Sequence, residues 1–61
     1  MQEIKYRNYR IRYHCVLGWF AHIYRPGANS AMSDIIEATR EEGEQILLVR
    51  VRARIDREEE S

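Results

Sequence analysis

Nine consecutive residues, Val16 to Tyr24, carry no charge and include the only Trp and the only Phe of the chain. Aromatic and β-branched side chains suit a pleated surface, so this composition predicts a strand that is buried on at least one face. Gly18 precedes the strand and Pro26-Gly27 ends it. Any core that this chain forms must be built on this strand.

The two faces of this strand are both uncharged, so charge does not indicate which face is buried, and side-chain size is used instead. Ala21 is a small residue between two large ones, which lets a helix approach the sheet closely. We therefore assign the face of Ala21 to the core and the opposite face to the surface. The inward set is Trp19, Ala21 and Ile23, and the outward set is Phe20, His22 and Tyr24.

Polar and apolar residues also alternate from Glu3 to His14, which predicts a half-buried strand. The phase of the alternation changes at Arg7-Asn8, and we expect a bulge or tight turn at Asn8, with the regular strand starting at about Tyr9. Cys15 to Gly18 then forms a hairpin connection. Its apolar residues Val16 and Leu17 either fold back on the core or are presented to a partner.

The second half of the chain supports two interpretations. In one, Ser33 caps a helix that ends at Gly43, and the alternation from Leu47 to Ile55 is a long strand, giving ββαβ. In the other, Asp34 to Ala38 is a third strand, and a capping box of Thr39 and Glu42 starts a helix that runs to about Glu58.

The order of charges favours the second interpretation, because a helix is stabilised by acids in its first turn and bases toward its end. We predict an α+β fold, a three-stranded antiparallel sheet packed on one C-terminal helix (βββα), with ββαβ as the alternative. The chain forms a single domain, 1–61, with 58–61 a frayed tail. The predicted core is Tyr9, Ile11, Tyr13, Trp19, Ala21, Ile23, Leu47, Leu48, Val51 and Ile55.

A domain of 61 residues is marginally stable without help, which makes self-association a plausible source of stability. The single cysteine, Cys15, excludes a disulfide within the chain and fits a reducing compartment. The uncharged runs are far shorter than the roughly 20 apolar residues of a membrane span, and the first residues lack the apolar run of a signal peptide. We expect a cytoplasmic protein with no membrane contact.

Three segments carry a resemblance to known proteins: Tyr6 to Ile11, Gly18 to Pro26 and Glu42 to Leu48. They resemble short uncharacterised bacterial proteins with a basic first strand, a Gly-Trp second strand and an Ile-Asp pair near the carboxyl end. This resemblance implies three strands and a C-terminal helix and brings no activity with it. In layout, Gly18-Trp19, Ala21 and Ile23 are also similar to the second strand of three-stranded, one-helix DNA-binding domains, the plant ethylene-response type and the phage integrase arm-binding type. The chain lacks the dense Arg and Trp run of the former.

The residues capable of chemistry are few. His14, Cys15 and His22 are the only imidazole or thiol ligands, which is too few for the paired ligands of a structural zinc site. Cys15 beside a histidine has no orienting third group or oxyanion hole in the sequence, and the three glycines form no phosphate loop. We predict no enzyme activity, no metal, no cofactor and no small-molecule substrate.

The net charge of zero conceals an asymmetry between the halves. Residues 1–32 carry five bases and one acid, and residues 33–61 carry five bases and nine acids. The aromatic residues all lie in the basic half, so the outward sheet face combines cations with flat rings. We predict a non-enzymatic binding or assembly module that acts through this face, and self-association of the chain into a homodimer is one form of that assembly. The alternative is a nucleic-acid-binding domain that uses the same face. The predicted surface is Arg10, Arg12, His14, Phe20, His22 and Tyr24.

Overall fold

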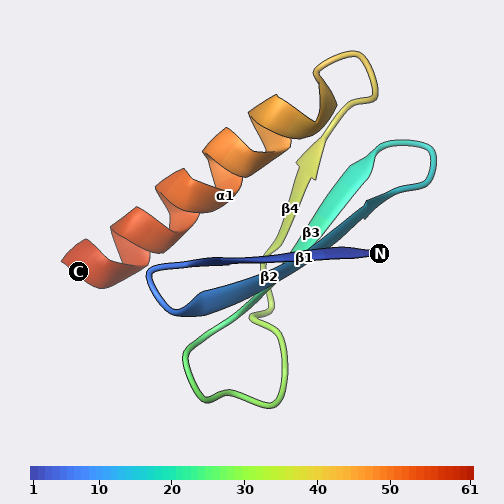
Figure 1. The fold of residues 1–61 in the computed structure, drawn as a ribbon. Helices are drawn as coiled ribbons and strands as arrows, with labels where there is room; N and C mark the ends of the chain where they lie inside the picture. The colour runs from blue at the N-terminus through green and yellow to red at the C-terminus, as the bar shows by residue number, and fades with distance from the viewer.

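A four-stranded antiparallel sheet and one C-terminal helix form the two layers of the computed structural model, which describes residues 1–61 (Figure 1). The strands lie side by side in chain order, so each is joined to the next without a crossover. The α+β class is therefore shown, with one more strand than predicted. The elements are β1 (Gln2–Tyr6), β2 (Tyr9–Cys15), β3 (Trp19–Tyr24), β4 (Ile35–Ala38) and α1 (Gly43–Glu60).

The additional strand arises at the phase change in the first segment. Arg7 and Asn8 both have positive φ, 52° and 71°, and they form a two-residue turn between the paired residues Tyr6 and Tyr9. Two left-handed residues give a hairpin turn whose twist matches that of its strands. The prediction of one strand before the Trp19 strand is corrected to two, because the turn reverses the chain and keeps Ile4 and Tyr6 on the same face as Tyr9.

The C-terminal half forms a short strand followed by a helix, so the ββαβ alternative is wrong. The capping box is present: the Thr39 backbone N–H donates to Oε1 of Glu42 at 2.9 Å, and the Glu42 N–H donates to Oγ1 of Thr39 at 3.1 Å. This box closes a single turn, because Gly43 then adopts a left-handed φ of 85°. The regular helix begins at Gly43, later than the capping box predicts.

The core lies between α1 and the sheet, where Leu47, Val51 and Ile55 of the helix are fully buried. Ala21 is also fully buried, so the helix packs on the sheet without an intervening large side chain. The other inward residues of β2 and β3 in the predicted core are buried, except that Trp19, like Leu48, is only partly buried. Met32 and Ala38 complete the buried set.

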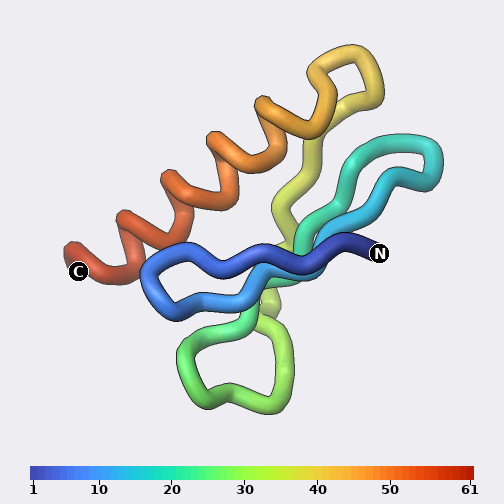
Figure 2. Tube along the Cα trace, in the orientation of Figure 1, coloured from blue at the N-terminus to red at the C-terminus, as the bar shows by residue number.

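Met32 is buried because the loop between β3 and β4 returns to the sheet. Figure 2 shows the chain leaving β3, making a wide loop and entering β4. The Met32 N–H donates to the backbone oxygen of Ile23 at 2.7 Å, which holds the end of this loop on β3. No pattern in the sequence indicates that Met32 is buried.

Three tyrosines of β1 and β2 connect the sheet to the helix through their hydroxyl groups. Each ring packs among apolar side chains, and each hydroxyl donates to a carboxylate of α1, which raises the pKa of the three phenols, that of Tyr13 to about 12. The pairs are Tyr6–Asp56 at 2.9 Å, Tyr9–Glu59 at 2.7 Å and Tyr13–Glu44 at 2.6 Å.

The C-terminal residues that were expected to fray continue the helix as far as Glu60. Glu58 accepts hydrogen bonds from Arg25 at 2.5 Å and from Arg54 at 3.2 Å, and these guanidinium groups lower its pKa. The Arg25–Glu58 and Tyr9–Glu59 bonds attach the last turn of α1 to the sheet and its loops.

Replacing Leu47 by alanine removes buried volume from the contact between helix and sheet. Leu47→Ala is expected to lower the free energy of unfolding by about 2–5 kcal/mol, measured by urea denaturation. Val49→Ala is the control on the same helix, because Val49 is 53% exposed whereas Leu47 is fully buried. Equal losses in the two variants would contradict the packing described.

Candidate functional site

The sheet face turned away from α1 is not covered by any element, and we call it the open face. Side chains alternate along each strand, and the buried residues Ile11, Ala21 and Ile23 lie on the other side, against the helix. All six residues predicted for the binding surface lie on the open face, with neighbours from β1 and β4. The face consists of Glu3, Lys5, Arg10, Arg12, His14, Phe20, His22, Tyr24, Ile35 and Glu37.

Planar side chains of β2 and β3 gather at the centre of the open face. The ring centroids of His14 and His22 are 6.2 Å apart with an interplanar angle of 12°, and those of His14 and Phe20 are 6.0 Å apart. Nδ1 of His14 is inaccessible to solvent and has no hydrogen-bond partner. Ile35 borders this cluster on β4 and is 49% exposed. The centre of the face thus presents rings and one aliphatic side chain.

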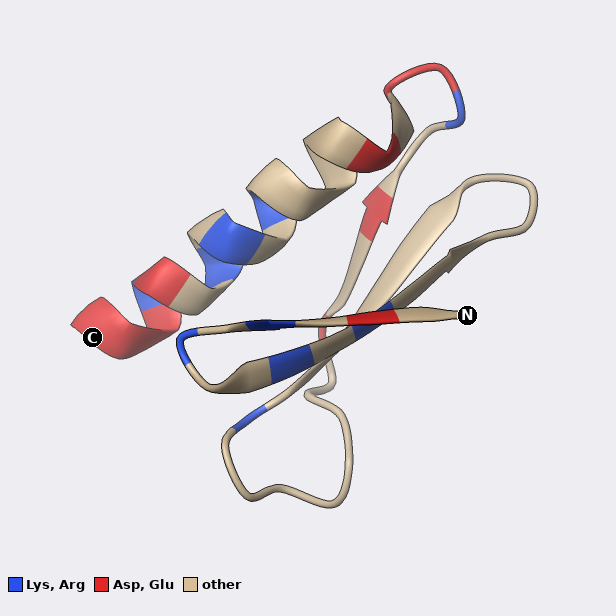
Figure 3. Ribbon diagram, in the orientation of Figure 1, with Lys and Arg blue, Asp and Glu red and all other residues tan.

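Cations flank this cluster on β1 and β2, and Figure 3 shows them on neighbouring strands together with an acidic position. The Arg10 guanidinium lies over the Tyr24 ring, 4.7 Å from its centroid, and its Nη2 donates to the Ala28 backbone oxygen at 3.3 Å. Nε of Arg12 lies 3.6 Å from Oε1 of Glu3. Two of the three cations are therefore partly compensated within the chain, and Lys5 forms no ion pair.

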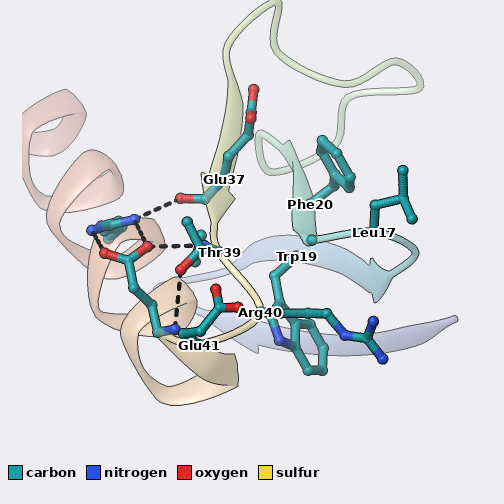
Figure 4. Close-up of a pocket in the computed structure, with 11 residues that line it drawn as sticks. Leu17, Trp19, Phe20, Glu37, Thr39, Arg40 and Glu41 are labelled. Carbon is teal, nitrogen blue, oxygen red and sulfur yellow. Dashed lines mark hydrogen bonds and ion pairs between the residues drawn. The ribbon is translucent and has the colours of Figure 1, made fainter.

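A concave feature lies at the end of the β2–β3 hairpin. It is a cleft of about 410 Å³ between the hairpin and the segment joining β4 to α1 (Figure 4). Trp19, Phe20 and Arg40 are among its lining residues, and Leu17 at its rim is 85% exposed. Val16 and Leu17 are therefore presented to solvent. The sequence did not identify this cleft, because its walls meet only when β3 pairs with β4.

Paired charges stiffen one wall of this cleft. Nη1 and Nη2 of Arg50 donate to the two carboxylate oxygens of Glu42 at 2.9 and 2.6 Å. These bonds, with the bond from the Thr39 N–H, hold the pKa of Glu42 at about 2, below its ordinary value of 4.5. The hydrogen bonds of this wall are dashed in Figure 4. These polar groups already satisfy one another.

His14 and His22 lie on the open face, and Cys15 lies at the end of β2. No three His, Cys, Asp or Glu side chains gather as a metal site requires. Cys15 is exposed, and neither it nor the histidines have an orienting carboxylate as a hydrogen-bond partner. Glu44 at the start of α1 accepts a bond from Tyr13. No helix is long and apolar enough to cross a membrane.

No family model, curated protein or solved structure is significantly similar to this chain. The open face combines planar and aliphatic groups at its centre with the cations of β1 and β2 beside them.

The pH dependence of stability reports on the Glu42–Arg50 pair. Folding lowers the pKa of Glu42 from 4.5 to about 2. Its contribution to the free energy of unfolding is therefore present above about pH 4.5 and is lost as the pH falls toward about 2. Glu42→Gln is expected to lose less stability than the wild type across this interval, measured by urea unfolding at several pH values. Glu41→Gln is the control, since Glu41 lies in the same turn and forms no ion pair, and it should follow the wild type. If the stability of Glu42→Gln fell with pH as that of the wild type does, the assignment of this pH dependence to the Glu42–Arg50 pair would be contradicted.

Proposed function

We propose that the protein is a non-enzymatic binding module whose open face binds an acidic segment of another protein. The observation that carries the proposal is the uncovered cluster of His14, Phe20 and His22, which lies beside the cations of β1 and β2. Rings held side by side offer contact area at little cost in conformational entropy, and aromatic residues and arginine dominate the energetics of protein interfaces.

The charges of the open face indicate the chemistry of the partner. Lys5 and Arg10 are cross-strand neighbours, so two positive charges stand side by side without an acid between them. Carboxylates of a partner would offset this repulsion. Phe20 and Ile35, in contrast, would pack against apolar side chains of the partner. A partner segment that combines acidic and apolar residues satisfies both requirements.

The acidic start of α1 in a second copy of the chain is a poor source of these carboxylates. Glu42 is held by Arg50 and Thr39, and Glu44 accepts the Tyr13 hydroxyl, so two of the three carboxylates are already used within the chain and only Glu41 is left. Binding of these carboxylates to the open face of a second copy would break their existing hydrogen bonds. We therefore assign the acidic segment to a different protein.

Nucleic acid is the second candidate, and the Arg10–Tyr24 pair is the observation that favours it. A guanidinium 4.7 Å from a ring centroid resembles the cation and aromatic platforms on which single-stranded bases stack. Glu3 and Glu37 on the same face oppose a phosphate backbone, and the chain has no excess of positive charge. These acids place nucleic acid second.

Fluorescence anisotropy with a labelled peptide of alternating glutamate and phenylalanine tests the proposal. Phe20→Ala and Arg10→Glu are each expected to weaken binding by about tenfold, which corresponds to about 1.4 kcal/mol. Arg57→Glu is the matched control, because it makes the same change of charge at an exposed position of α1. It should bind the peptide as the wild type does.

The same measurement with a single-stranded RNA oligonucleotide separates the two candidates. Absence of peptide binding, or peptide binding that neither variant weakens, would contradict the proposal. Oligonucleotide binding that weakens steeply with salt and is lost in Arg10→Glu would support the nucleic-acid candidate instead.

A further inference from the structure

We infer that the exposed edge of β1 is a self-pairing edge, to which β1 of a second copy adds in antiparallel orientation about a two-fold axis at Ile4. The two sheets then form one continuous sheet. This inference concerns a different surface from the open face and does not depend on what that face binds. It rests on the accessibility of the edge, on its backbone hydrogen-bonding pattern and on its charges.

The sheet has two edge strands, and only one of them is protected. At β4, Nη1 of Arg50 donates to the backbone oxygen of Glu37 at 3.0 Å, and α1 packs beside this strand. Arg54 also binds Asp34, just before β4. No such side-chain bond occupies the backbone of β1. An exposed edge of this kind is a template for another strand.

The turn determines which backbone groups of β1 are free. In a two-residue hairpin the residues that flank the turn, Tyr6 and Tyr9, form a hydrogen-bonded pair, and such pairs alternate along an antiparallel ladder. The N–H and C=O groups of Ile4 therefore point toward β2. Those of Glu3 and Lys5 point outward, where they can pair with another strand.

The outward groups restrict the possible registers. In an antiparallel pair, outward-pointing residues must lie opposite outward-pointing residues, so Glu3 faces Glu3, Lys5 faces Lys5, or Glu3 faces Lys5. The first two registers place like charges opposite each other, which is destabilising. The third, centred on Ile4, places opposite charges together at both ends. The sequence Glu3-Ile4-Lys5 is thus self-complementary.

The neighbouring strand reinforces this register. Arg12 lies opposite Glu3, and Arg10 lies opposite Lys5. In the paired sheet Glu3 stands between Arg12 of its own chain and Lys5 of the second copy, and the Lys5–Arg10 repulsion gains a facing carboxylate. On the helix side, Ile4 is only partly buried in the single chain. The two-fold axis brings the two Ile4 side chains together in a close, non-hydrogen-bonded pair.

Sedimentation velocity on the full chain tests the inference through reversal of charge. The wild type is expected to form a dimer. Glu3→Lys and Lys5→Glu each place like charges opposite each other twice, so each variant alone is expected to dimerise at least about tenfold more weakly. An equimolar mixture of the two variants restores opposite charges at both positions and is expected to form a heterodimer.

Each outcome of this experiment either supports or overturns the pairing of β1 with β1 of a second copy. A monomeric wild type at the highest soluble concentration overturns the inference, as does a dimer that survives in both single variants. Failure of the mixture to associate also overturns it, because circular dichroism and denaturation of each variant establish that the chains are folded. Arg57→Glu, with the charge change on α1, should leave the dimer intact. Peptide binding depends on Arg10 and Phe20, so the two proposals can fail separately.

Discussion

The contact between α1 and the sheet at Ala21 is the constraint on which the rest of this structure depends. Ala21 is fully buried beneath a helix whose apolar stripe is Leu47, Val51 and Ile55. A larger side chain at this position would separate the two layers and open voids around the others, since cores are packed at nearly crystalline density. All ten buried residues belong to one cluster, because the chain has a single helix and this helix covers only one face of the sheet.

Polar contacts at the margins orient the helix on this apolar layer. The tyrosine hydroxyls of β1 and β2 reach carboxylates near both ends of α1, and the guanidinium groups of Arg50 and Arg54 reach Glu37 and Asp34 on the β4 side. The bonds of Arg50 and Arg54 are exposed, so each contributes little alone, whereas the tyrosine bonds are partly buried. Together they fix the direction of the helix and close the β4 edge, and in doing so they leave β1 as the accessible edge.

The pattern of alternation allowed much of the fold to be predicted. The face of Trp19, Ala21 and Ile23 and the helical stripe from Leu47 to Ile55 depend on local periodicity, and the structure places both in the layer between sheet and helix. The number of strands was misjudged, because a phase change at Arg7-Asn8 is compatible with either a bulge or a reversal of the chain. The burial of Met32 had no local signal, since it follows from a loop that returns to Ile23.

The sequence by itself determined which residues can share a face, because side-chain direction along a strand or helix follows from the backbone period alone. It thereby grouped Arg10, Arg12 and His14 with the outward side chains of β3. Only the tertiary structure decided which carboxylates are already used, which edge is closed by Arg50 and which backbone groups of Glu3 and Lys5 remain free. These depend on contacts between residues far apart in the chain, and no local pattern encodes them.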